Sequence, residues 1–189
     1  MAEQDRYVRS RDVEAVGVPR AYLTRLVRSG VLRRVARGLY ELSDAPFDER
    51  ASLAEVCAIL PRATVCLLSA AQLHGITSAS PQAVWVTLTP GTPPPKVTTV
   101  AIEFVYMKDE LLSGVVEKQD YFGAEIRVTD LEKTVVDMFR YRSRVGLELA
   151  LEALRAYVDR SSHYGELMRV AGVNGVSTVI RPYLTALLA

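Results

Sequence analysis

Two short helix-like segments separated by a glycine lie near the start of the chain, and this pattern constrains its fold most. Residues 9–16 are expected to form the first helix, with Ser10 as its N-cap and Gly17 as the residue that ends it. The second helix is expected to run from Pro19, a residue suited to a first helical turn, to Gly30. Two helices joined by so short a turn are typical of a helix-turn-helix.

A β-hairpin is predicted directly after the second helix. Residues 31–35 and 39–42 are rich in branched and aromatic side chains, and the short turn between them contains Gly38. A helix-turn-helix followed by such a hairpin is the order of elements in a winged helix-turn-helix. The sequence therefore predicts this fold for residues 1–45, which we call the head.

Helical spacing divides the side chains of the head into an inner and an outer set. The apolar residues expected to face the core are Val13 and Val16 in the first helix, and Tyr22, Leu23, Leu26 and Val27 in the second. The outer set contains guanidinium groups that can donate two hydrogen bonds to guanine or bind phosphates. The residues expected to contact double-stranded DNA are Arg20, Thr24, Arg25, Arg28, Arg33, Arg34 and Arg37.

The charge distribution supports this expectation, although the whole chain has a formal charge of only +1. Residues 1–42 contain nine arginines, no lysine and five acidic residues, a surplus of four positive charges. Residues 43–189 contain fourteen basic and seventeen acidic residues, a surplus of three negative charges. A basic segment joined to a mildly acidic one indicates a nucleic-acid-binding module attached to a domain with another role.

The remaining 144 residues, 46–189, are predicted to form a mixed α/β domain, which makes the whole chain α+β. Proline and small polar residues at 43–46 indicate a linker after the head. A capping box, Thr129 to Glu132, is expected to open a helix that ends near residue 141. Further helices are predicted at 48–60, in the second part of 64–74, at 146–158, at 164–171 and at 177–188, and strands at 83–89, 99–107 and within 114–129, with a turn at 121–123.

Several segments together resemble the AbiEi-type antitoxins of type IV toxin–antitoxin systems. The resemblance covers roughly residues 8–158 and depends on the order of its motifs. The matching segments are Asp12–Arg20 and Leu26–Tyr40 in the head, and Leu68–Gly75, Val84–Pro90 and Gly123–Asp137 after it. It implies an antitoxin whose head binds inverted repeats in operator DNA and represses its own operon. It also implies that the C-terminal domain counteracts a nucleotidyltransferase-like toxin as a possible partner.

No catalytic, metal or cofactor site is expected. Neither His74 nor His163 has cysteines at a zinc-ligand spacing, and there is no Walker loop or Rossmann glycine fingerprint. Cys57 and Cys66 are expected to be buried thiols. The N-terminus has no signal-peptide core, and no apolar run is long enough for a membrane span. We therefore expect a cytoplasmic protein that is monomeric in solution and pairs on DNA.

Two alternatives remain open from the sequence. The chain can be an antitoxin that acts mainly by binding the toxin directly, because the acidic C-terminal region complements a basic partner surface. It can also be a one-component transcriptional regulator whose C-terminal domain senses a small molecule.

Overall fold

The computed structural model describes residues 7–36, 38–44, 51–94, 100–113, 116–121 and 124–189. The chain divides into two compact units. Unit 1 contains residues 1–62 and 118–126, and unit 2 contains residues 63–117 and 127–189. The predicted domain boundary at residue 45 falls in a segment, 45–50, that lies outside the described residues, so it stays a prediction.

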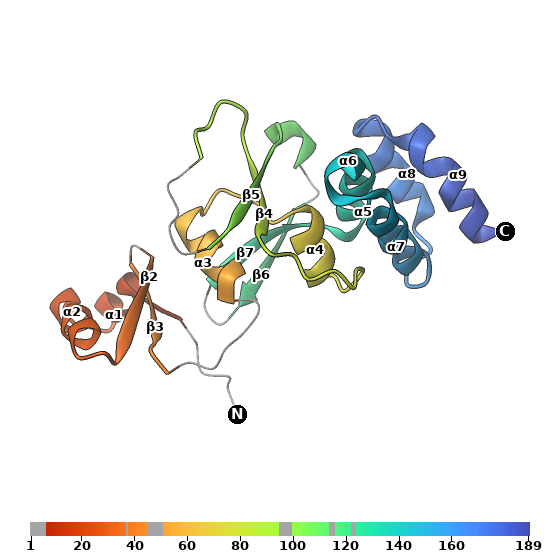
Figure 1. Cartoon of the computed structure of the whole chain (residues 1–189). Helices are drawn as coiled ribbons and strands as arrows, with labels where there is room; N and C mark the ends of the chain where they lie inside the picture. The colour runs from red at the N-terminus through yellow and green to blue at the C-terminus, as the bar shows by residue number, and fades with distance from the viewer. Residues whose placement is uncertain (1–6, 37, 45–50, 95–99, 114–115, 122–123) are drawn as a thin grey trace. The chain divides into compact units, whose positions relative to one another are not determined.

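The head has the predicted order of helices and strands (Figure 1). Helices α1 (Ser10–Ala15) and α2 (Arg20–Arg28) precede the hairpin strands β2 (Leu32–Ala36) and β3 (Leu39–Leu42). A short strand that the sequence analysis missed, β1 (Tyr7–Arg9), pairs antiparallel with β3 and completes a three-stranded sheet of order β1-β3-β2. The α+β class with an N-terminal helix-turn-helix is confirmed.

Glycines form the two turns that shape the head. Gly17, between the helices, has φ of +81°, and Gly38, in the hairpin turn, has φ of +77°. Side chains are disfavoured in this left-handed region, so glycine fits both turns. Ser10 donates its backbone N–H to the carbonyl of Gly38 at 2.9 Å and is buried as the first helical residue. The prediction of Ser10 as the N-cap is wrong, because Arg9 holds that position.

The core of the head is small and differs from the predicted stripe. Leu23 is buried as expected, and Leu26 and Val27 are half-buried. Val16 and Tyr22, by contrast, were predicted to face inward but are 77% and 55% exposed. The sheet contributes the other buried apolar side chains of the head. The buried apolar residues of the sheet are Tyr7, Leu32 and Leu39.

The strands after the head surround a buried extended segment at residue 65. Strands β4 (Val84–Leu88) and β5 (Ile102–Tyr106) pair in parallel, and β6 (Val116–Tyr121) pairs with β7 (Ala124–Thr129). Val65 forms single bridges to Val86 of β4 and Val128 of β7, so it links the two strand pairs. The predicted turn at 121–123 includes two residues, 122 and 123, outside the described part.

Helices precede, separate and follow these strands along the chain, and the last of them form its C-terminal end (Figure 1). Helices α3 (Ala51–Ile59) and α4 (Leu67–Leu73) lie on either side of the bridge residue in sequence, and a 3-10 turn, η1, spans Asp109–Leu111. The C-terminal helices pack around a core that includes Phe139, Leu154 and Ile180. They are α5 (Leu131–Arg140), α6 (Arg142–Val145), α7 (Leu147–Val158), α8 (Tyr164–Val173) and α9 (Ser177–Leu188).

The start of α5 differs from the predicted capping box. Asp130 is the N-cap, and its carboxylate accepts the backbone N–H of Lys133 at 2.7 Å. Glu132 instead accepts a hydrogen bond from the hydroxyl of the buried Tyr157 at 2.9 Å. Since both Thr and Asp can cap a helix, the sequence left the register of this cap ambiguous by one residue.

Cys57 and Cys66 are buried as predicted, and neither is in a disulfide. Burial raises the pKa of the Cys66 thiol well above its usual value, so this sulfur stays protonated. Among the residues that the structure describes, no helix has both the length and the apolar composition needed to cross a membrane.

Candidate DNA-binding surface

Helix α2 presents a polar face opposite its core residues. Leu23 fixes the inner side of the helix, and Thr24, Arg25 and Arg28 are exposed. Thr24 and Arg28 are neighbours one turn apart, and so are Arg25 and Arg28. Neither arginine side chain has an ion-pair partner among the described residues. Both guanidinium groups belong to the last turn, where the helix dipole favours positive charge.

Arg20, at the start of the same helix, is held by an acidic residue of α1. Its Nε lies 2.5 Å from Oε1 of Glu14, and its Nη2 donates to Oε2 at 3.0 Å. Both side chains reach solvent, and the two contacts form a bidentate pair. Because Glu14 offsets the positive charge of Arg20, the N-terminal end of α2 is less basic than its C-terminal end.

Arg33, on β2, is also engaged within the head. Its guanidinium forms an ion pair with Glu41, which lies opposite it on β3 and is fully buried. A buried carboxylate without a positive partner is costly, so Arg33 has a structural role in addition to the one predicted from the sequence. Sequence reasoning missed Glu41, although an acidic residue between apolar positions of a predicted strand was a usable signal.

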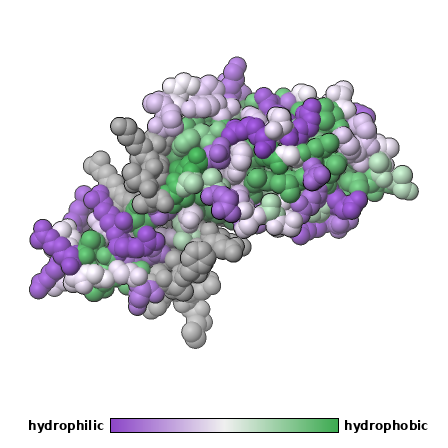
Figure 2. Space-filling model, in the orientation of Figure 1, coloured by the Kyte–Doolittle hydropathy of each residue, from purple (hydrophilic) through white to green (hydrophobic). Residues whose placement is uncertain are grey.

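The other two arginines of the predicted set belong to the hairpin. Arg34 lies opposite Tyr40 on β3 and its side chain is exposed. Arg37 lies outside the described residues, so its predicted role stays a prediction. Hydrophilic residues cover much of the head surface that faces the viewer in Figure 2, which agrees with a face that contacts a charged ligand.

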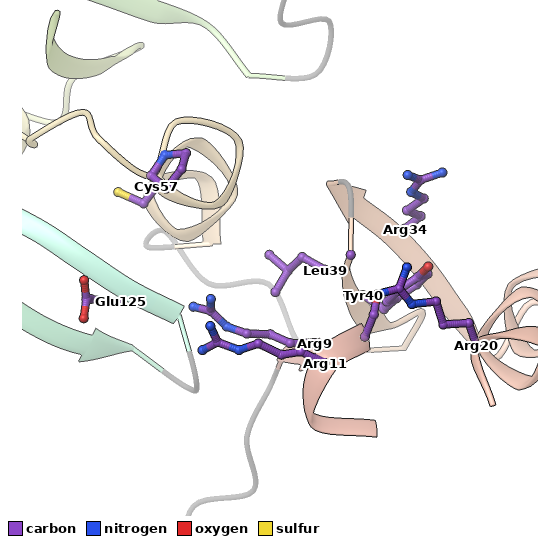
Figure 3. Close-up of a pocket in the computed structure, with 11 residues that line it drawn as sticks. Arg9, Arg11, Arg20, Arg34, Leu39, Tyr40, Cys57 and Glu125 are labelled. Atoms are coloured by element: carbon purple, nitrogen blue, oxygen red, sulfur yellow. The ribbon is translucent and has the colours of Figure 1, made fainter. Parts of the chain in front are cut away.

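A second concentration of guanidinium groups lines a cavity of about 720 Å³ in unit 1 (Figure 3). Arg9 and Arg11 extend in the same direction from the start of the head, and Arg20 reaches toward Tyr40. Arg34 also lines the cavity. The predicted set is therefore divided: Thr24, Arg25 and Arg28 share the outer face of α2, whereas Arg20 and Arg34 border this cavity.

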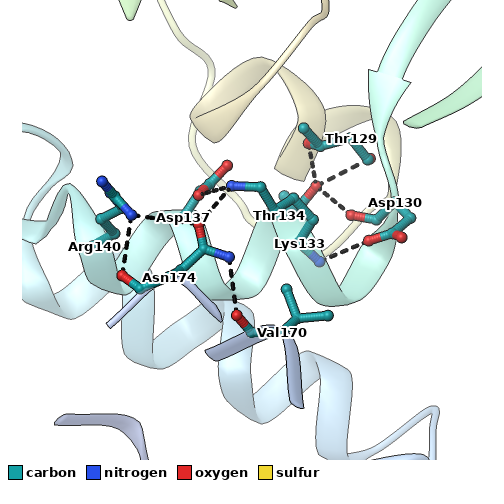
Figure 4. A network of polar contacts seen from close by, with 8 residues as sticks. All are labelled: Thr129, Asp130, Lys133, Thr134, Asp137, Arg140, Val170 and Asn174. Carbon is teal, nitrogen blue, oxygen red and sulfur yellow. Dashed lines mark hydrogen bonds and ion pairs between the residues drawn. The ribbon is translucent and has the colours of Figure 1, made fainter. Parts of the chain in front are cut away.

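Unit 2 contains a buried polar network that the sequence analysis did not find (Figure 4). Lys133 and Asp137, one turn apart on α5, form an ion pair with no solvent exposure. The Lys133 ammonium also donates to Oδ1 of Asn174 at 3.1 Å, and Arg140 donates to the carbonyl of Asn174 at 3.0 Å. Lys133 and Asp137 are inaccessible to a substrate, and the network joins α5 to the C-terminal end of α8.

The motif segments of the C-terminal region meet through side-chain hydrogen bonds. Ser69 accepts the backbone N–H of Trp85 at 3.0 Å. His74 donates from Nε2 to the carbonyl of Thr129 at 2.7 Å, and Thr134 donates to the carbonyl of Asp130 at 2.7 Å. These residues therefore have structural roles. In the described part of the chain, no three potential ligands form a group that could hold a metal ion.

Comparison with known families gives a match to the same basic segment. Residues 2–43 match the family described as "Transcriptional regulator, AbiEi antitoxin". This agrees with the resemblance seen in the head. The match ends before the C-terminal region, where the resemblance over residues 46–158 stays a prediction.

The whole chain is similar in fold to a solved structure, "Crystal structure of RV2827C protein from Mycobacterium tuberculosis". The TM-score is 0.51 and the sequence identity 14%, over 95% of this chain and 75% of that chain. A similarity at this identity concerns the fold alone. Comparison with curated proteins found no match.

Proposed function

We propose that this chain is an antitoxin-type autorepressor whose head binds operator DNA. One observation carries the proposal: the exposed face of α2 holds Thr24, Arg25 and Arg28 on a small scaffold that has a basic hairpin beside it. A recognition helix of this kind enters the major groove, and arginine reads guanine there through O6 and N7. The AbiEi antitoxin family match of residues 2–43 supports the same role.

In this proposal the seven predicted residues have different tasks. Arg25 and Arg28 contact base edges, and Thr24 lies on the same exposed face. Arg34 and Arg37, which belong to the hairpin, contact phosphates. Arg33 contacts a phosphate while it keeps its ion pair with Glu41. Arg20 contributes least, because Glu14 already pairs with it. The operator contains inverted repeats, so two copies of the chain pair on the DNA although each is monomeric in solution.

Fluorescence anisotropy with labelled duplexes tests the DNA-binding proposal. The duplex from upstream of the gene should bind more tightly than a scrambled duplex of equal composition. The double variant Arg25→Ala/Arg28→Ala should lose this preference. Arg181→Ala is the matched control, because Arg181 is an exposed arginine on α9 in unit 2 and should leave binding unchanged. Equal affinity of the wild type for both duplexes would contradict the proposal.

We propose further that the C-terminal region counteracts a nucleotidyltransferase-like toxin encoded beside this gene. Co-expression with the adjacent open reading frame tests this second part separately. The wild type and the Arg25→Ala/Arg28→Ala variant should both restore growth, whereas only the wild type should repress a reporter under the operon promoter. A neighbouring gene whose product is harmless when expressed alone would contradict this part.

A further inference from the structure

Tyr22 is a large side chain that the fold of the head leaves in solvent. The residue is 55% exposed, although helical spacing predicted that it would join the core. The neighbouring turn adds two more apolar side chains at the surface, Val16 at 77% and Val18 at 36% exposure. These three apolar side chains are exposed within seven residues of the chain, and exposed apolar patches mark interaction sites.

The position of Tyr22 on α2 indicates that its ligand is a base edge. It belongs to the first turn of the helix, and Arg25 follows three residues later on the same surface. In a helix-turn-helix, the N-terminal residues of the second helix contact base edges. The guanidinium of Arg20, which would otherwise dominate this end, is paired with Glu14. The N-terminal end of α2 thus offers apolar surface beside a charged group.

We infer that Tyr22 recognises the 5-methyl group of a thymine in the major groove, next to the base that Arg25 contacts. The thymine methyl is the apolar group that base pairs present in that groove, so an exposed ring flanked by arginine complements it. This inference rests on the proposed DNA-binding function. It adds Tyr22 to the seven DNA-contacting residues predicted from the sequence, and it predicts a preference for thymine at one position of the binding site.

Replacement of thymine by uracil tests the inference without changing the protein, because uracil lacks only the methyl group. Duplexes enriched by the wild-type chain from a random library supply the binding site, and each thymine is then replaced in turn. At one or more positions we expect the wild type to bind about fourfold more weakly, the effect of one buried methyl group. Tyr22→Ala should bind the thymine and uracil duplexes equally, and Tyr22→Phe should keep the difference.

Tyr106→Ala is the matched control, since Tyr106 is 48% exposed on β5 of unit 2, and it should keep the full thymine preference. Circular dichroism of each variant checks the fold. The inference is overturned if the wild type binds the thymine and uracil duplexes equally at every position. It is also overturned if Tyr22→Ala still prefers thymine to uracil, or if Tyr22→Ala changes only the self-association of the chain. A wild type that binds no duplex would also overturn the proposed function, whereas sequence-specific binding without methyl dependence would overturn this inference alone.

Discussion

The arginines of α2 in the head and the ion pair of α5 in unit 2 hold their charges in opposite ways. In the head, arginines lie at the surface, and Arg25 and Arg28 have no ion-pair partner among the described residues. In unit 2, Lys133 and Asp137 are fully buried and paired with each other. Exposed guanidinium groups contribute little to folding but remain available to a ligand, whereas a buried pair is available to no ligand but constrains the packing around it. The exposed arginines of α2 thus remain available to a ligand, whereas the buried pair of α5 serves the packing of unit 2.

The largest expected effect concerns the buried pair. Lys133→Met should lower the free energy of unfolding of unit 2 by about 3–5 kcal/mol, because it leaves Asp137 buried without a cation. The double variant Lys133→Met/Asp137→Leu should recover much of this loss. Urea denaturation followed by circular dichroism measures both effects. A loss below about 1 kcal/mol for the single variant would show that the pair does not have the role assigned to it.

The second effect concerns the exposed arginines of α2. Arg25→Ala and Arg28→Ala should each weaken binding to the upstream duplex by about 1–3 kcal/mol if the side chain reads a base. Their effect on thermal stability should be small, since neither side chain contacts a described acidic residue. Anisotropy titrations and melting curves on the same samples separate the two quantities. Variants that melt at a lower temperature but bind the duplex with unchanged affinity would show that these arginines stabilise the fold and do not recognise DNA.

The third effect concerns Arg33, which is exposed at the surface of the head but forms an ion pair with the buried Glu41. Arg33→Ala should destabilise the head by about 2 kcal/mol, since it leaves a buried carboxylate without its partner. Amide hydrogen exchange should then be faster in β2 and β3 and unchanged in unit 2. Glu41→Gln in the Arg33→Ala background should restore part of the protection. Unchanged exchange in the single variant would mean that this ion pair does not stabilise the sheet.

The smallest expected effect is a pH dependence in unit 2. Burial raises the pKa of Asp130, the N-cap of α5, to about 6 from 3.8. The folded state therefore holds a proton that the unfolded state has released, so stability should fall as pH rises from about 4 to 6 and change little above that. Asp130→Asn should flatten this part of the stability curve. Parallel curves for the variant and the wild type would assign the pH dependence to another group.

Local signals predicted the elements of the head and the C-terminal helices well. Glycine turns and apolar spacing placed α1, α2 and the hairpin, and the predicted helix at 177–188 coincides with α9. The errors come from tertiary contacts. Tyr22 fits a helical stripe but is displaced from the core, where the unpredicted β1 contributes Tyr7. The network of Lys133 and Asn174 joins residues 41 positions apart, which no local pattern reveals, although the four-residue spacing of Lys133 and Asp137 was visible.

The salt dependence of DNA binding tests the central claim most directly. The full chain is titrated against the upstream duplex and a scrambled duplex at salt concentrations between about 50 and 200 mM. The three phosphate contacts proposed for each copy should weaken binding about fortyfold over this range, because each contact releases condensed counterions. We predict such a fall for both duplexes, with the upstream duplex tighter throughout. Binding that does not change with salt would contradict an arginine surface that meets the phosphate backbone.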